Sequence, residues 1–162
     1  MPKDDFVKIE NLLESGKFPE LKSFLDELDI KFKNDKKEQF KIAIIRSYLN
    51  ILLGEYQYAL EMINWVIEQN KISQDSIIYL DAILTRGEAL YFLGKYNELY
   101  RDIKFSEKLL TSLSNNQDQL ITQYAKLEQL KGRYFTAKGS FDKVLDHLFQ
   151  AQSLYKKIIK YY

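Results

Sequence analysis

The chain of 162 residues contains no cysteine, one histidine and two prolines. Without cysteine it has neither a disulfide framework nor a thiolate nucleophile, and one histidine cannot build a zinc site of the usual composition. The lack of thiols fits a reducing compartment. Both prolines, Pro2 and Pro19, lie near the start of the sequence, so no proline interrupts a helix after residue 20. These absences favour an all-α fold and predict neither a metal ion nor a cofactor.

The sequence also lacks an excess of charge of either sign. Its 24 basic and 23 acidic residues give a formal net charge of +1. No large field of one sign is therefore present to attract nucleic acid or an anionic membrane. The first residues are charged, and no apolar run approaches the roughly 20 residues that span a bilayer. We expect a soluble, cytoplasmic protein whose partners include no nucleic acid and no membrane.

All six glycines belong to one pattern. Glycines at positions 16, 54, 94 and 139, which are 38, 40 and 45 residues apart, each precede a phenylalanine or tyrosine by two residues. Gly87 and Gly132 stand seven residues before the last two of them. Between the turn glycines, apolar residues recur at three- and four-residue steps, the period of a helix and not of a strand. The pattern predicts a tandem array of helical hairpins.

Turn and capping signals place the ends of the helices. Pro19 suits the first turn of a helix, and Asp35 with Glu38 resembles a capping box. Polar breaks at 70–75 and 112–118 predict loops between repeats. Gly87 and Gly132 lie inside helices at a cost of about 1 kcal/mol, which indicates close helix packing. We predict one domain with approximate repeats 1–34, 35–73, 74–115 and 116–162, and helices over 4–15, 19–33, 36–53, 56–69, 75–93, 96–113, 118–138 and 141–160.

These repeats resemble the tetratricopeptide repeat (TPR) family, whose first helix carries a small residue seven positions before a turn glycine and an aromatic. The clearest copy runs from Gly87 through Gly94-Lys95-Tyr96 to Leu99, and the second from Gly132 through Gly139-Ser140-Phe141 to Val144. The repeats are longer than the family's usual 34 residues, and the family's tryptophan and proline are missing. The resemblance implies a right-handed α-solenoid of about four hairpins and eight helices.

The resemblance also implies a function in binding, with no catalytic residues. The first helices of the hairpins would line a concave groove that holds a peptide segment or helix of a partner protein. One branch of the family clamps a terminal carboxylate with asparagines; Glu10, Tyr48 and Glu88 stand at those positions here, so that clamp is absent. The implied groove residues are Lys3, Phe6, Glu10, Lys41, Ile44, Tyr48, Asp81, Leu84, Glu88, Tyr91, Lys126, Gln129 and Arg133.

Other interpretations of the chain and of these residues stay open. The array is alternatively a regulatory sensor of a peptide or metabolite within a larger protein, or a self-associating structural scaffold. Tyr48 and Tyr91 are alternatively core residues, because aromatics at helical spacing usually pack inside. Glu10, Glu88 and Arg133 are alternatively a solvated face or intrahelical pairs.

The last helix is unusually apolar for the end of an array, which normally has a polar outer face. We expect an exposed apolar patch there. Three explanations are open: the chain is part of a longer protein, it forms homo-oligomers through this helix, or its partner docks on it. The residues of this possible C-terminal interface are Leu154, Tyr155, Ile158, Ile159, Tyr161 and Tyr162.

Three further features carry no predicted function. His147 has no recognisable nucleophile beside it in the sequence, so we interpret it as a surface or core histidine. Trp65 is interpreted as a packing residue, with an exposed contact anchor as the alternative. The basic loop of Lys31, Lys33, Lys36 and Lys37 is diluted by acidic neighbours and is expected to be solvated. No motif of an enzyme is present, and we predict that the protein is not one.

Overall fold

The computed structural model describes residues 1–73, 75–113 and 120–160 of the chain, without the side chains of 71–73 and 158–160. This part of the chain consists of helices without a strand, which confirms the predicted all-α fold. The helices are α1 (Lys3–Glu14), α2 (Phe18–Lys31), α3 (Lys36–Leu52), α4 (Tyr56–Ser73), α5 (Ser76–Phe92), α6 (Tyr96–Ser112), α7 (Ile121–Ala137) and α8 (Phe141–Lys160).

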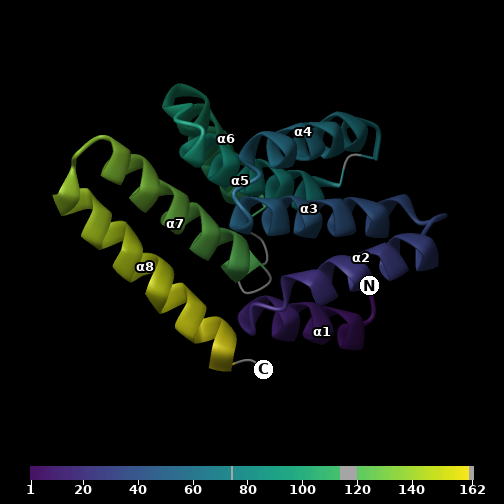
Figure 1. The fold of residues 1–162 in the computed structure, drawn as a ribbon. Coiled ribbons are helices and arrows are strands. Elements are labelled where there is room, and N and C mark those ends of the chain that lie inside the picture. Colours follow the sequence, from purple (N-terminus) through teal and green to yellow (C-terminus); the bar gives the residue numbers. More distant parts are fainter. Residues whose placement is uncertain (74, 114–119, 161–162) are drawn as a thin grey trace.

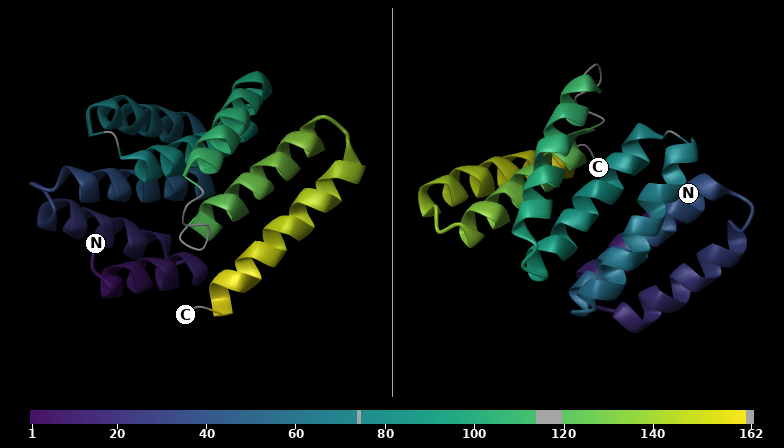
Figure 2. Two further views of the ribbon diagram at one scale, coloured as in Figure 1. Left: turned by 180° about the vertical axis from the view of Figure 1, so that it is seen from behind. Right: turned by 90° about the horizontal axis from the view of Figure 1, so that it is seen from above.

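Consecutive helices pack against each other as hairpins, and the hairpins stack in the order of the sequence (Figure 1). Among the first helices of the hairpins, α5 also contacts both α3 and α7 directly. In Figure 1 the array curves so that the C-terminal end of α8 comes close to α1, and the view from behind in Figure 2 agrees. The arrangement is that of a helical-repeat solenoid whose two ends approach each other.

Most predicted helix ends lie within two residues of the observed ones, and α4 is the main exception. It continues to Ser73, whereas the prediction ended it at residue 69. The polar residue Asn70, which was interpreted as the start of a loop, is buried, and its side-chain amide donates to the carbonyl of Asp75 at 2.9 Å. That bond satisfies the buried amide and lets the helix continue. The predicted loop at 112–118 lies largely outside the described residues.

The turns between paired helices follow the predicted chemistry. Gly16, Gly54, Gly94 and Gly139 have φ between 66° and 82°, the left-handed region that glycine enters without a Cβ clash. Only half of the predicted capping box forms at α3. Asp35 accepts a bond of 3.1 Å from the backbone amide of Glu38, but the Glu38 carboxylate pairs with Lys41 at 2.7 Å and does not return to Asp35.

Two apolar clusters fill the interior. The larger one runs through the second, third and fourth hairpins, and the smaller one joins the first hairpin to one face of α3. Helix α3 contributes to both, with Phe40 and Ile51 in the larger cluster and Ile42 and Leu49 in the smaller one. The first hairpin is therefore attached to the rest of the array mainly through α3.

The predicted close packing at the mid-helix glycines is confirmed. A Cβ atom on Gly87 would lie 2.8 Å from Cδ1 of Leu130, and one on Gly132 would lie 3.1 Å from Cδ2 of Leu148. The side chains of Leu130 and Leu148 differ in their freedom to move, because Leu130 is 1% exposed whereas Leu148 is 44% exposed. Leu148 has room to turn away, and Leu130 does not.

We therefore expect the free energy of unfolding of Gly87→Ala to be lower than that of Gly132→Ala by about 1–3 kcal/mol, which is the usual cost of overpacking a core. Both changes bring the same gain in helix propensity, so their difference isolates the packing at each site. Urea denaturation of the two variants beside the wild type measures it. Equal free energies of unfolding for the two variants would contradict the close contact between α5 and α7.

Candidate binding groove

A cavity of about 310 Å³ lies on the side of the array that faces its centre. Its lining comes from α1, α3, α5 and α7, the first helix of every hairpin, and from Tyr155 of α8. Helix-period spacing explains the pattern, because residues four apart lie on one face of a helix. Phe6 and Glu10 of α1 form one such pair, and the corresponding pairs on α3 and α5 are Ile44 with Tyr48 and Leu84 with Glu88.

Eight of the 13 groove residues implied by the family resemblance line this cavity. They are Phe6, Glu10, Ile44, Tyr48, Leu84, Glu88, Lys126 and Gln129. The other five, which lie outside the lining, are Lys3, Lys41, Asp81, Tyr91 and Arg133. Tyr155, which also lines the cavity, was predicted for the C-terminal interface and not for the groove. The sequence did not name the remaining lining residues for the groove, although each lies one helical turn from a residue that it did name; they are Ile9, Leu13, Ile45, Thr85 and Thr122.

The lining has a buried floor and an accessible rim. Ile44 and Leu84 are 8% and 1% exposed and belong to the larger apolar cluster, so they form the floor. Phe6 and Tyr48, by contrast, are 43% and 40% exposed. Exposed aromatic rings beside a hollow are the kind of side chain that anchors a partner. The floor thus serves stability, and the rim is open to contact.

Tyr91 and Arg133 belong to a packed cluster that includes Glu88, a residue of the cavity lining. The Tyr91 ring is partly buried and contacts the rings of Phe92 and Tyr96, with centroids 5.2 and 6.2 Å apart. The Arg133 guanidinium lies over Tyr91 at 5.4 Å, and its Nε is 2.9 Å from Oε2 of Glu88. Glu88 and Arg133 are on α5 and α7, so the pair is interhelical and was not among the intrahelical pairs considered from the sequence.

The charged residues of the lining differ in their partners. Glu88 pairs with Arg133, and Lys126 pairs with Asp81 at 3.3 Å. Glu10 has no ion-pair partner among the described residues. Burial raises the pKa of the Glu88 carboxyl above its ordinary value of 4.5, and the charges of Arg133 and Lys126 offset part of the rise.

The raised pKa of Glu88 predicts a dependence of stability on pH. A carboxyl whose pKa is higher in the folded state stabilises the fold below its ordinary pKa, and this contribution is lost as pH rises through the folded-state value. We expect Glu88→Gln and the wild type to match in acid, and the wild type to become the less stable as pH rises from about 4.5 towards neutrality. Urea denaturation between pH 4 and 8 measures the difference. If Glu88→Gln instead became the less stable protein as pH rises, the attraction between the Glu88 carboxylate and Arg133 would outweigh the cost of burying that carboxylate.

The predicted C-terminal interface is only partly described. The side chains of Ile158 and Ile159, and all of Tyr161 and Tyr162, lie outside the described residues. Leu154 and Tyr155 are partly buried, and the Tyr155 hydroxyl donates to Oε1 of Gln129 at 3.2 Å. Tyr155 therefore faces the cavity and not an outer surface. The sequence did not indicate this contact, because it depends on how α8 lies relative to the other helices of the fold.

Another part of α8 exposes an apolar stripe. In the described part of the chain α8 packs against α7 alone, so its opposite face is left uncovered. An exposed apolar patch was expected on this helix, and the stripe lies closer to its N-terminal end than the residues that were predicted for the interface. Its residues are Phe141, Leu145, Leu148 and Phe149, which are 68%, 57%, 44% and 66% exposed.

His147 and Glu128 have structural roles. Nδ1 of His147 lies 2.6 Å from Oε2 of Glu128, and its ring stacks on Phe135 with centroids 5.3 Å apart. Glu128 also pairs with Lys131 at 2.7 Å. These contacts join α7 to α8 and account for a carboxylate at that position.

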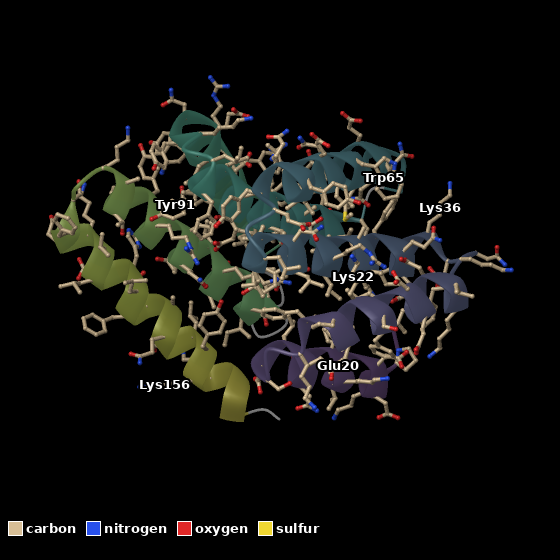
Figure 3. The ribbon with its side chains drawn as sticks, viewed as in Figure 1. Glu20, Lys22, Lys36, Trp65, Tyr91 and Lys156 are labelled. Carbon is tan, nitrogen blue, oxygen red and sulfur yellow. The ribbon has the colours of Figure 1, made fainter. Side chains whose placement is uncertain are left out.

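Trp65 and the basic loop lie away from the cavity. Trp65 lies on α4, remote from α8 (Figure 3). Its side chain is 48% exposed and packs edge-on against the ring of Phe40 on α3. It is thus a packing residue on one side only. Two lysines of the loop region form ion pairs, Lys31 with Asp5 at 2.7 Å and Lys37 with Asp75 at 2.8 Å. The loop is partly neutralised by these pairs.

Within the described residues, no group of three or more histidine or acidic side chains is placed to hold a metal ion. No helix in that part of the chain combines the length and apolar character that crossing a membrane requires. Comparison with protein-family models, with curated proteins and with solved structures found no match for this chain. A function for the cavity is therefore inferred from its own shape and chemistry.

Proposed function

We propose that the protein is a non-catalytic interaction module that binds a segment of a partner protein on its concave face. One observation carries the proposal: the first helices of all four hairpins contribute side chains to a single cavity. A segment lying across those helices contacts all of them at once. We also propose that the array is a long-repeat relative of the TPR family, since its hairpins turn at the glycines that carry the resemblance.

The dimensions of the cavity favour a polypeptide over an isolated metabolite. Its volume of about 310 Å³ lies at the lower end of the range for small-molecule pockets. The exposed rings of Phe6 and Tyr48 extend the contact surface beyond it. Such a surface suits a segment that inserts an anchor and lies along the rim.

A peptide selection tests this function and requires no identified partner. The wild-type chain is immobilised and used to enrich 12-residue peptides from a random library displayed on phage, and the enriched peptides are synthesised. Their affinity is then measured by fluorescence anisotropy for the wild type, for Tyr48→Ala and for the control Tyr58→Ala. Both tyrosines are exposed, at 40% and 55%, but Tyr58 lies on α4 outside the cavity.

We expect Tyr48→Ala to weaken binding about tenfold or more, as truncation of an aromatic anchor does. Tyr58→Ala should bind like the wild type. Circular dichroism of both variants confirms that they remain folded. Failure to enrich any peptide, or equal binding by all three chains, would overturn the proposed function.

A further inference from the structure

The cavity carries an ordered pattern of polar groups above its apolar floor. On α1, α3 and α5 an apolar residue of the lining is followed four positions later by a polar one, and we call these two sets the apolar row and the polar row. The apolar row is Phe6, Ile44 and Leu84. The polar row is Glu10, Tyr48 and Glu88, two carboxylates with a tyrosine on the helix between them.

The charge of the polar row is negative and incompletely neutralised. Lys126, the only basic residue of the described lining, is offset by Asp81, and Glu88 is offset by Arg133. Glu10 has no counter-ion among the described residues and is exposed. The lining as a whole therefore has an excess of negative charge at the Glu10 end.

Aromatic rings line the same cavity as this excess charge. Phe6 lies one helical turn from Glu10, and Tyr48 and Tyr155 line the same cavity from α3 and α8. The faces of aromatic rings attract cations, and the attraction is stronger where water is partly excluded. Carboxylates and ring faces together are the surroundings that bind an ammonium or a guanidinium group.

We propose that the groove selects partner segments that carry a lysine or arginine, whose cationic head lies in the polar row of Glu10, Tyr48 and Glu88. Apolar side chains next to that basic residue contact the Phe6 ring and the floor. This inference rests on the proposed function, because it specifies the chemistry of the segment that the groove binds. The source of the cation is a side chain of the partner polypeptide.

The peptides from the phage selection test the specificity directly. In each peptide that depends on Tyr48, the lysine or arginine is replaced by glutamine, and affinities are measured at 50 and 300 mM NaCl. In the protein, Glu10→Gln is compared with Glu14→Gln. Glu14 is also exposed and lies one turn further along α1, but it does not line the cavity.

We expect the selected peptides to share a basic residue, and its replacement to weaken binding about tenfold. Glu10→Gln should weaken binding about threefold to tenfold at low salt, and less at 300 mM, whereas Glu14→Gln should have no effect. Peptides that need Tyr48 but carry no basic residue would overturn the inference and leave the proposed function intact. Equal effects of Glu10→Gln and Glu14→Gln would also overturn it. A selection without any Tyr48-dependent peptide would overturn both.

Discussion

Replacing Arg86 with methionine should lower the free energy of unfolding by about 3–5 kcal/mol, because the buried Asp102 is left without its counter-charge. Arg86 and Asp102 form a two-pronged pair between α5 and α6, with Nε–Oδ2 and Nη2–Oδ1 distances of 2.8 and 2.5 Å. Asp102 is 5% exposed, and Nη1 of Arg86 also reaches Oδ1 of Asn64 on α4 at 3.3 Å. The guanidinium thus connects three helices at the centre of the array.

The pKa of Asp102 explains why the loss should be large. Burial raises the pKa of this carboxyl above its ordinary value, and the hydrogen bonds and charge of Arg86 hold part of that rise back. Without Arg86 the carboxylate must either stay charged in the interior or take up a proton. The deficit of Arg86→Met should therefore be smaller in acid than at neutral pH.

Two controls separate the buried pair from the loss of a long side chain. Arg101→Met makes the same change at an exposed position of α6 and should alter the free energy of unfolding by less than about 0.5 kcal/mol. The double change Arg86→Met with Asp102→Leu removes both charges and should recover most of the stability. Urea denaturation measures the free energy of unfolding of the wild type, the two single variants and the double variant. Equal losses at Arg86 and Arg101, or no recovery in the double variant, would show that the unpaired charge of Asp102 is not the cause of the loss.

Replacing Leu84 with alanine should destabilise the fold by about 2–5 kcal/mol, the range for truncating a fully buried leucine. Leu84 is 1% exposed and belongs to the larger apolar cluster, although it also forms the floor of the binding cavity. The family resemblance placed it among the contacts of the groove. Its truncation is consequently a poor probe of binding, because a loss of affinity would include a loss of folded protein.

Leu145→Ala on α8 is the matched control, since the same atoms are removed at a position that is 57% exposed. We expect a change of less than about 0.5 kcal/mol there. Thermal and urea denaturation of the two variants measure the contrast. A loss at Leu145 as large as that at Leu84 would show that another molecule covers the exposed stripe of α8 in solution.

Local chemistry was sufficient to predict the helices and most of their ends. A turn glycine such as Gly94 ends its helix because positive φ is open to it without strain, wherever the neighbouring hairpins lie. The close contact at Gly87 was predictable for a similar reason, because a glycine in mid-helix needs a compensating gain. Asn70 was misread because its amide finds a partner only once Asp75 is in place.

The composition of the cavity was predictable only in part. Helical spacing and the family resemblance indicated side chains such as Glu10, Tyr48 and Glu88, because residues on one face of a helix are set by its period. They did not indicate which of these charges are neutralised. Glu88 and Arg133 are 45 residues apart in the sequence and meet only because α5 and α7 pack together.

The sequence by itself determined an array of helical hairpins. The helical period of the apolar residues and the turn conformation of each glycine are both set by interactions within a few residues of the chain. Only the tertiary structure decided that the two ends of the array approach each other and that Tyr155 of α8 lines the same cavity as Phe6 of α1. The curvature that brings these helices together is the sum of small rotations between successive hairpins. Each rotation depends on how side chains from distant repeats interlock, and helical periodicity carries no record of that packing.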